Sequence, residues 1–239
     1  MLRVFKHKKW STTRVSSWAT FFIIYTNDIT NFIPKKHLIS YADDTTILNY
    51  KASYNELEMD TFNILNSTVQ YFSSIGLPVN ELKTNFINFT TDYKKVSKSV
   101  KPSLFIDDYR LHEVEYTKFL GVYIDDHLNW NVHVDNLYSK LSSTIYIIKT
   151  ISKLKSLKLS LTCYYSYFYS QITYSIMFWG SSSANNLNKI FILQKRALRY
   201  ITYKNQSDSC RELFIMLNLL TVPSIYIYNN FKQLKFTRT

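Results

Sequence analysis

Two adjacent carboxylates, Asp43 and Asp44, are the side chains of this sequence most suited to chemistry by their type and spacing. They stand between two short apolar pairs, residues 38–39 and 47–48, and no Gly or Pro interrupts the stretch. This pattern predicts a tight hairpin with the aspartates at its turn and half-buried strands on either side. Hard carboxylate oxygens on a stiff turn suit Mg²⁺ or Mn²⁺, although a solvated Asp-Asp turn explains the same residues.

The stretch that begins at Tyr41 and Ala42 and continues through Asp43 and Asp44 also resembles a known motif. It is similar to the catalytic turn of reverse transcriptases, in particular those of non-LTR (LINE-type) retrotransposons. The resemblance implies an RNA-directed DNA polymerase in which both aspartates are catalytic and bind the metal, Mg²⁺ or Mn²⁺. It also implies deoxynucleoside triphosphates as substrates and an RNA template and a DNA primer as partners.

Residues 76–84 resemble the next block of the same family, Gly-Leu-x-x-Asn-x-x-Lys-Thr, which leads into a strand expected over residues 86–89. The resemblance assigns Lys83 to catalysis. A lysine beside a metal-bound triphosphate steadies it or protonates the leaving pyrophosphate. The alternative is a surface lysine that follows a turn.

A third block covers residues 118–125 and resembles the family's Lys-Phe-Leu-Gly-x-x-Ile-Asp hairpin. In the family this hairpin grips the end of the primer, so the resemblance assigns Phe119, Leu120 and Gly121 to nucleic-acid binding. Gly121 would let a nucleic-acid backbone approach closely. Ordered blocks at the family's spacing are more specific than any one motif alone.

Two further elements surround these blocks. Residues 53–75 read as a core-packing helix with a capping box of Ser53 and Glu56, ended by Gly76. Residues 104–111 read as a second hairpin, in which we interpret Asp107 and Asp108 as ordinary turn residues rather than as a second metal site.

From residue 134 onward the apolar spacing becomes helical and resembles the thumb region of the same enzymes. We expect a further helix over about residues 186–203 and a last short helix with a capping box of Ser209 and Glu212. The basic side chains expected to contact the phosphate backbone of a primer–template duplex are Lys153, Lys155, Lys158, Lys195, Arg196 and Arg199. The alternative is solvated charge on a helical bundle.

The net charge of +12 is unevenly distributed, with +6 in residues 1–40, −5 in residues 41–130 and +11 in residues 131–239. An acidic centre between basic ends suits a metal site beside a phosphate-binding surface.

Two cysteines, Cys163 and Cys210, indicate neither a disulfide framework nor a zinc module. We therefore expect an intracellular protein of the nucleus or cytoplasm, without a secretion signal. The uncharged residues 159–188 read as a buried helix pair rather than a membrane span, so no membrane partner is expected.

The predicted fold class is α+β: a partial polymerase palm over residues 1–130, with helices packed on an antiparallel sheet, then an all-helical thumb-like domain over residues 131–239. Where the family has a glycine-rich turn, this sequence has Thr13, Arg14, Val15, Trp18 and Ala19. The resemblance implies a third catalytic aspartate on the order of a hundred residues before the Asp-Asp turn, which would complete the carboxylate cage of a two-metal site. The sole acid before Asp43 is Asp28, which we expect at the end of an apolar helix over residues 21–29. We therefore expect a fragment of the palm and thumb that is inactive as it stands. The alternatives are a non-catalytic nucleic-acid-binding remnant and a product without function.

Overall fold

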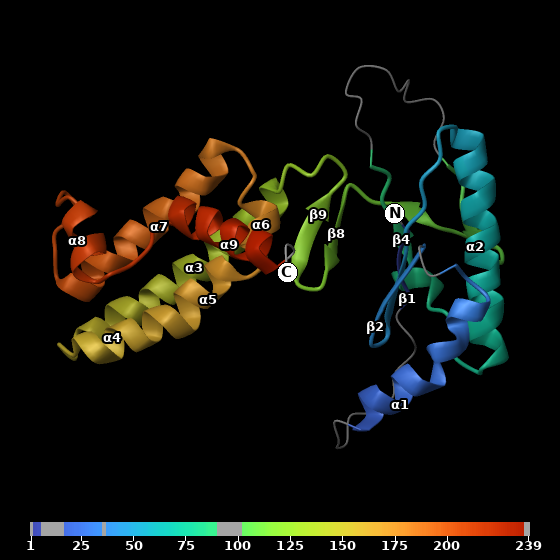
Figure 1. The fold of residues 1–239 in the computed structure, drawn as a ribbon, viewed down its shortest axis with the longest axis horizontal. Coiled ribbons are helices and arrows are strands. Elements are labelled where there is room, and N and C mark those ends of the chain that lie inside the picture. The colour runs from blue at the N-terminus through green and yellow to red at the C-terminus, as the bar shows by residue number, and fades with distance from the viewer. Residues whose placement is uncertain (1, 6–16, 35–36, 90–101, 237–239) are drawn as a thin grey trace. The chain divides into compact units, whose positions relative to one another are not determined.

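The computed structural model describes residues 2–5, 17–34, 37–89 and 102–236 (Figure 1). The chain forms two compact units, residues 1–117 and residues 118–239. Each unit has a cluster of buried apolar side chains of its own, so each has the core of an independent structural unit.

Five short strands form the sheet of the first unit, in the order β2-β3-β1-β4-β7. They are β1 (Leu2–Phe5), β2 (Leu38–Tyr41), β3 (Asp44–Ile47), β4 (Asn85–Phe86) and β7 (His112–Glu113). Neighbouring strands are antiparallel, except that β4 and β7 are parallel. The strand expected over residues 86–89 is therefore limited to β4, which starts one residue earlier and is shorter.

The expected hairpin is confirmed, because β2 and β3 pair in antiparallel fashion with Tyr41 opposite Asp44. The turn consists of Ala42 and Asp43, and Ala42 adopts the left-handed conformation with φ 49°. Asp44 is consequently the first residue of β3 rather than a turn residue. The half-burial that we expected on both sides is uneven: β3 is buried from residue 45 to 47, whereas β2, at the edge of the sheet, is mostly exposed.

Helix α2 (Tyr54–Ser74) confirms the helix expected over residues 53–75, and Ser53 is its N-cap. The capping box is wrong, because the Ser53 side chain makes no cap hydrogen bond. At the other end the N–H of Gly76 donates to the Ser73 carbonyl at 3.0 Å, and the next N–H reaches the Phe72 carbonyl at 2.8 Å. These two bonds form a Schellman motif, in which Gly76 adopts φ +70°.

Helix α2 covers one face of the sheet, and its buried side chains pack with Ile47 of β3 and Phe86 of β4. The helix buries Thr61, Ile64, Leu65, Thr68, Tyr71 and Phe72. Phe62 of the same helix is 44% exposed. The packing of the helix on the sheet is as expected, and its buried stripe includes two threonines, Thr61 and Thr68, among apolar and aromatic side chains.

The helix expected over residues 21–29 begins earlier, as α1 (Ser17–Tyr25), and is followed by a 3-10 helix, η1 (Asn27–Asn31). Asp28 lies in η1, and its carboxylate accepts a hydrogen bond from the buried hydroxyl of Tyr71. Trp18 and Ala19 lie in α1, whereas Thr13, Arg14 and Val15 lie outside the described residues. Asp28 thus ties η1 to α2, in agreement with its expected place at a helix end.

The second expected hairpin is also present in the first unit. Its strands are β5 (Phe105–Ile106) and β6 (Tyr109–Arg110), which pair in antiparallel fashion. Asp107 adopts φ 50° at the turn, a conformation that Asp tolerates better than most side chains. Both turn aspartates are exposed.

The second unit is helical apart from a two-stranded hairpin of β8 (Tyr116–Phe119) and β9 (Val122–Asp125), which begins at the unit boundary. The helices are α3 (Asn131–Ser152), α4 (Leu157–Cys163), the π-helix η4 (Tyr164–Tyr169), α5 (Ser170–Thr173), α6 (Ile176–Trp179), α7 (Ala184–Thr202), α8 (Arg211–Met216) and α9 (Val222–Phe236). No strand occurs after residue 125 among the described residues. This confirms the expected change from sheet to helix near Trp130.

Helices α3 and α7 pack side by side and run parallel. Near their first turns the Asn186 amide donates to Asn131 Oδ1 at 2.8 Å, and Lys189 pairs with Asp135 at 2.8 Å. At their far ends the Tyr203 hydroxyl, just after α7, donates to the Ser152 carbonyl at 2.6 Å. Contacts in the same order along both helices fix a parallel pair.

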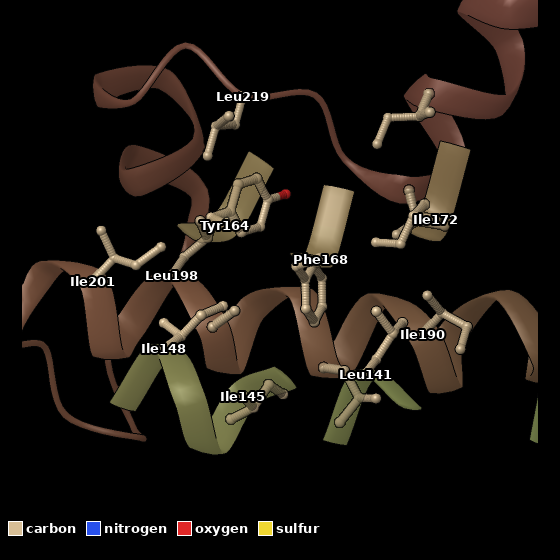
Figure 2. Packing of buried hydrophobic residues seen from close by; sticks show 14 of the residues in the cluster. Leu141, Ile145, Ile148, Tyr164, Phe168, Ile172, Ile190, Leu198, Ile201 and Leu219 are labelled. Atoms are coloured by element: carbon tan, nitrogen blue, oxygen red, sulfur yellow. The ribbon is translucent and has the colours of Figure 1, made fainter. Parts of the chain in front are cut away.

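The core of the second unit lies between these helices and the run of α4, η4 and α5 (Figure 2). Figure 2 shows α3 contributing Leu141, Ile145 and Ile148, α7 contributing Ile190, Leu198 and Ile201, and Tyr164, Phe168 and Ile172 pointing into the space between them. The tyrosine-rich uncharged stretch is therefore a core element, as expected, but it forms several short helical segments rather than two helices.

The end of the chain differs from expectation. Helix α8 begins after its N-cap Cys210, which makes no side-chain cap hydrogen bond. The Ser209 hydroxyl accepts the Arg211 N–H at 3.4 Å rather than that of Glu212, so the second capping box is wrong. Helix α8 is also not the last helix, since α9 follows it. Pro223 in the first turn of α9 and the Thr221 hydroxyl, which accepts from the Ser224 N–H at 3.3 Å, mark its start.

Taken element by element, the chain is a mixed α+β protein, as predicted. The two compact units divide between Thr117 and Lys118, so the β8–β9 turn belongs with the helices. The division at residue 130 into a palm and a thumb stays a prediction.

Candidate active site and nucleic-acid interface

The two candidate metal ligands stand next to each other at the β2–β3 hairpin but differ in environment. Asp43 is a turn residue and is exposed, whereas Asp44 is half-buried at the start of β3. The Asp44 Oδ1 atom is buried and has no hydrogen-bond partner. A buried carboxylate oxygen without a donor is costly, so this oxygen is free to accept a bond from a cation or an N–H.

This donor set fits a hard divalent cation, because two carboxylates on a short turn supply the oxygen ligands that Mg²⁺ and Mn²⁺ prefer. In the part of the chain that the structure describes, no group of three His, Cys, Asp or Glu side chains is placed to hold a metal. The Asp107 and Asp108 turn, by comparison, has both side chains exposed and no buried orphan oxygen. The feature that distinguishes the first aspartate pair is therefore the buried Asp44 oxygen.

Lys83 is the last residue of a 3-10 helix, η3 (Glu81–Lys83), which leads into β4. Its side chain is exposed and makes no ion pair with any described residue. Its helix contacts β1, the neighbour of β3 in the sheet. A role for Lys83 beside the triphosphate stays a prediction.

The predicted primer-gripping residues form the turn of the β8–β9 hairpin. Phe119 ends β8, and Leu120 and Gly121 form the turn, both with positive φ, 45° and 86°. Leu120 is 36% exposed. The hairpin is confirmed, whereas its contact with a primer stays a prediction.

A single carboxylate fixes the link from this hairpin to α3. Asp125 Oδ1 accepts from the N–H groups of His127 and Asn129 at 3.2 and 2.7 Å, and Oδ2 accepts from the Trp130 N–H at 2.7 Å. These bonds hold Trp130, the N-cap of α3, in the left-handed conformation with φ 64°. Asp125, the last residue of the family-like block, therefore stabilises the N-terminus of α3, where the helix dipole favours negative charge.

His133, in the first turn of α3, is buried beneath the hairpin. Its Nδ1 accepts the Tyr123 N–H at 3.4 Å, and its Nε2 is buried without a partner. Burial, together with the positive charge of Lys140, lowers the pKa of His133 to about 4. The imidazole is therefore neutral at pH 7, and its unprotonated Nδ1 anchors β9.

The basic residues of the first predicted group lie where α3 turns into α4. Lys153 and Lys155 lie between the two helices and Lys158 is in the first turn of α4, and all three are exposed. None of them forms an ion pair with a described residue. These side chains are free to contact phosphates, although Lys153 also lies at the C-terminal end of α3, where the helix dipole favours positive charge.

The second basic group lies on α7, and its three members differ. Arg196 is exposed, whereas Lys195 is half-buried with its Nζ 4.1 Å from the centroid of the Phe191 ring. Arg199 donates from Nε and Nη2 to the Asp208 carbonyl at 3.2 and 2.9 Å. Arg199 thus holds the loop after α7, and these hydrogen bonds compete with its predicted phosphate contact. Arg196, which is exposed, is the member of the group most available to a phosphate.

Two residues with clear roles were absent from the sequence prediction. Gln194 is fully buried and binds the Leu220 carbonyl and the Val222 N–H, at 2.9 and 3.0 Å. Tyr174 donates its hydroxyl to the Leu120 carbonyl. The partners lie 26, 28 and 54 residues away, and no local pattern encodes contacts of that range.

No described helix combines the length and the apolar character that a membrane crossing needs.

The chain is similar to three curated polymerases of mobile elements. It is 26% identical over 174 residues to the probable RNA-directed DNA polymerase from transposon BS of Drosophila melanogaster, which covers 71% of this chain and 19% of that protein. It is 24% identical over 176 residues to the corresponding protein from transposon X-element of the same fly, covering 70% and 18%. The third is the retrovirus-related Pol polyprotein from type-1 retrotransposable element R1 3 of Nasonia vitripennis, 26% identical over 113 residues, covering 47% and 30%.

The chain spans about a fifth of the length of the two fly proteins. No protein-family model matches the sequence, and no solved structure matches the fold. A fourth similarity is to the RNA-directed DNA polymerase from mobile element jockey of Drosophila melanogaster, 24% identical over 184 residues. Together with the ordered motifs, these similarities identify the chain as homologous to a segment of the RNA-directed DNA polymerases of non-LTR retrotransposons.

Proposed function

We propose that this chain is the part of an RNA-directed DNA polymerase that carries the metal-binding aspartate pair and the primer-contacting surface. The single observation that carries the proposal is the buried, unpartnered Asp44 oxygen beside Asp43, on a hairpin that matches the family's catalytic motif. In this reading residues 1–130 belong to the palm, residues 131–239 to the thumb, and the substrates are deoxynucleoside triphosphates.

Asp43 and Asp44 would hold Mg²⁺ or Mn²⁺. When bound, such an ion stabilises the negative charge that develops on the transferred phosphoryl group. The hairpin keeps the two carboxylates adjacent, and the rigid start of β3 orients Asp44. The exposed Lys83 ammonium is available to a triphosphate, where its charge or its proton would assist departure of pyrophosphate.

The metal site is tested by the effect of Mn²⁺ on amide NMR signals. We expect Mn²⁺ at millimolar concentration to broaden signals of residues 41–47 selectively, because a two-carboxylate site binds weakly. Replacing Asp44 with Asn should abolish this broadening.

The second aspartate turn of the chain provides a matched control. The double substitution Asp107→Asn and Asp108→Asn removes an exposed pair from a similar hairpin and should leave the broadening at residues 41–47 unchanged. Equal broadening at both turns would contradict a specific site and would favour the solvated-turn interpretation.

Binding a metal ion is not sufficient for this polypeptide to polymerise DNA on its own. A two-metal site needs carboxylates that clamp both ions, and the described residues place no third His, Cys, Asp or Glu side chain with Asp43 and Asp44 to hold a metal. Because the sequence also lacks the family's glycine-rich turn and a third aspartate at the expected spacing, we expect no primer extension by the isolated chain with Mg²⁺ or Mn²⁺. Extension above background that Asp43→Ala abolishes would contradict this expectation.

A second candidate function is nucleic-acid binding without catalysis. It is favoured by the basic surplus of residues 131–239, which contain 14 Lys and Arg but 3 Asp and Glu, and by the exposure of Lys153, Lys155, Lys158 and Arg196. Binding of a primer–template duplex by a chain that fails to bind Mn²⁺ would support this second function.

A further inference from the structure

The turn of the β8–β9 hairpin is covered by a side chain from a distant part of the second unit. The Tyr174 hydroxyl donates to the Leu120 carbonyl. A Cβ built on Gly121 would lie 3.4 Å from Tyr174 Cε1, 3.5 Å from its hydroxyl oxygen and 3.8 Å from Cζ. The edge of the tyrosine ring therefore lies against Gly121, on the side where any other residue would carry its side chain.

Tyr174 is itself held firmly in place. Its carbonyl oxygen accepts a hydrogen bond at 3.1 Å from Nε1 of Trp179, which is fully buried. The next residue, Ser175, adopts φ 54° and breaks the chain direction between α5 and α6. The ring of Trp179 in turn lies 6.1 Å from that of His133, which anchors β9. The buried Trp179 thus contacts both residues that hold the hairpin, Tyr174 at its turn and His133 at β9.

Tyr174 alters the surface that the β8–β9 turn presents to a nucleic acid. The space beside Gly121 that a nucleic-acid backbone would use is occupied by Tyr174. Tyr174 as a residue remains 53% exposed, however, and Leu120 next to it is 36% exposed. An exposed aromatic ring with a fixed orientation is a stacking platform for an unpaired or terminal base.

We infer that Tyr174 positions the hairpin turn for nucleic-acid binding, so that the terminal base of a primer rests on Leu120 and the exposed Tyr174 ring rather than on Gly121. This inference rests on the proposed function, in which the hairpin grips a primer. Because the hydroxyl is engaged with Leu120, the ring is already ordered before the base arrives, and little side-chain freedom is lost on binding.

The test uses the full chain and a DNA primer annealed to an RNA template, with 2-aminopurine as the 3′-terminal base of the primer. Stacking on a tyrosine changes the fluorescence of this base, a signature that a purely structural residue would not control directly. We expect Tyr174→Leu to remove the change and to weaken binding about tenfold, the order expected for loss of one stacked base. Tyr174→Phe should keep the fluorescence change, because the ring remains.

Tyr167 provides the matched control. It is 55% exposed in the same unit and lies in η4, so Tyr167→Leu removes an equivalent ring without touching the hairpin. We expect the Tyr167→Leu variant to bind the duplex with the affinity of the unmodified chain and to give the same 2-aminopurine fluorescence change.

Thermal unfolding of each variant identifies any loss of fold. If Tyr174→Leu does not fold, Tyr174→Phe decides the matter: loss of the Leu120 bond should then accelerate amide exchange at Gly121 and Val122 while the fluorescence change persists. Tyr174→Leu that folds and binds with unchanged affinity and fluorescence would overturn the inference alone. An unmodified chain that does not bind the duplex at all would contradict the proposed function as well.

Discussion

Gln194 shows how one buried amide can hold three segments together. Its Nε2 donates to the Tyr164 hydroxyl and the Leu220 carbonyl, both at 2.9 Å, and its Oε1 accepts the Val222 N–H at 3.0 Å. Replacing Gln194 with Leu keeps the volume but leaves these three groups buried without their partner. We expect the free energy of unfolding to fall by about 3 kcal/mol, measured by urea denaturation.

The neighbouring arginines provide the contrast for that measurement. Arg196 is exposed, so Arg196→Ala should change the free energy of unfolding by less than about 0.5 kcal/mol. Arg199→Ala removes two hydrogen bonds to the Asp208 carbonyl and should cost about 1–2 kcal/mol. If Arg196→Ala destabilised the chain as much as Gln194→Leu, the distinction between surface and core positions on α7 would be wrong.

The buried His133 predicts a dependence of stability on pH. The pKa of His133 is lowered from 6.5 to about 4, so between these values the unfolded chain binds more protons than the folded chain. The contribution of His133 is therefore fully present above pH 6.5 and is lost as the pH falls toward 4, by about 3 kcal/mol in all.

Substituting His133 with Gln removes the titrating group while keeping an acceptor for the Tyr123 N–H. Between pH 7 and pH 5 the variant should lose less stability than the unmodified chain. His127→Gln is the matched control, since it replaces a partly exposed histidine beside Asp126 with the same side chain and leaves His133 in place. Identical pH profiles for the unmodified chain and the His133 variant would show that His133 is not the cause.

At the level of single residues, the sequence revealed those whose chemistry depends on immediate neighbours. Asp43 and Asp44 were found because adjacent carboxylates between apolar pairs are a local pattern, and the hairpin followed from it. Tyr174 and Gln194 act through partners 26 to 54 residues away. Only the fold brings these groups together, so no spacing in the sequence could have indicated them.

Among the elements, two glycines stand at helix ends for different physical reasons. Gly76 adopts φ +70° and has no atom within 4 Å of where a Cβ would lie, so Gly76→Ala should cost only its backbone strain, about 1 kcal/mol. At Gly180 a Cβ would clash with the Ile176 carbonyl oxygen and would lie 2.9 Å from Tyr226 Cγ.

The Gly180→Ala substitution forces α6 and α9 apart, since Tyr226 belongs to α9, and should cost about 1–3 kcal/mol. We therefore expect a larger drop in melting temperature for Gly180→Ala than for Gly76→Ala, measured side by side by calorimetry. Tyr226→Ala combined with Gly180→Ala should restore part of the loss caused by the clash. The reverse order of the two glycine variants would contradict the steric explanation.

The elements themselves were largely predictable, with errors at their ends. Helical spacing placed α2 and α7 within about two residues of their observed bounds, whereas α3 begins at Asn131, before the expected residue 134. Both capping boxes failed, because a Ser-x-x-Glu pattern only permits the bonds and does not enforce them. Helix α9 was missed, although Pro223 in its first turn was a usable start signal.

For the whole molecule, the charge distribution predicts salt-dependent binding of nucleic acid by the second unit. Each lysine that neutralises a phosphate contributes about −0.9 to the slope of log affinity against log salt concentration. Replacing Lys153, Lys155 and Lys158 with Ala should therefore flatten this slope by up to about 2.7 and should weaken binding equally for all base sequences. The measurement is a salt titration by fluorescence anisotropy.

The control for this titration is Lys189→Ala. Lys189 already pairs with Asp135 at 2.8 Å, so its removal should change the slope by much less than one exposed lysine does. An affinity that is flat between low and high salt, or unchanged in the triple variant, would indicate a solvated charged face without a phosphate partner.

At this scale the sequence predicted the fold class and the change from sheet to helix, because periodicity reports both. It did not predict the parallel pairing of α3 and α7 or the place of the β8–β9 turn in the helical unit. These arrangements depend on which apolar faces pack together in the folded chain, and the spacing of residues in a single sequence does not specify those pairings.

The parallel pairing of α3 and α7 also constrains the order in which the second unit can form on the ribosome. The bonds that join the two helices link residues 51 to 55 positions apart in the sequence, so closing them requires ordering a long intervening loop. Until residues 184–202 have been synthesised, the apolar stripe of the 22-residue helix α3 has no α7 to cover it. During translation that stripe is transiently exposed apolar surface, so a chain truncated before α7 should be more prone to aggregate than the full chain.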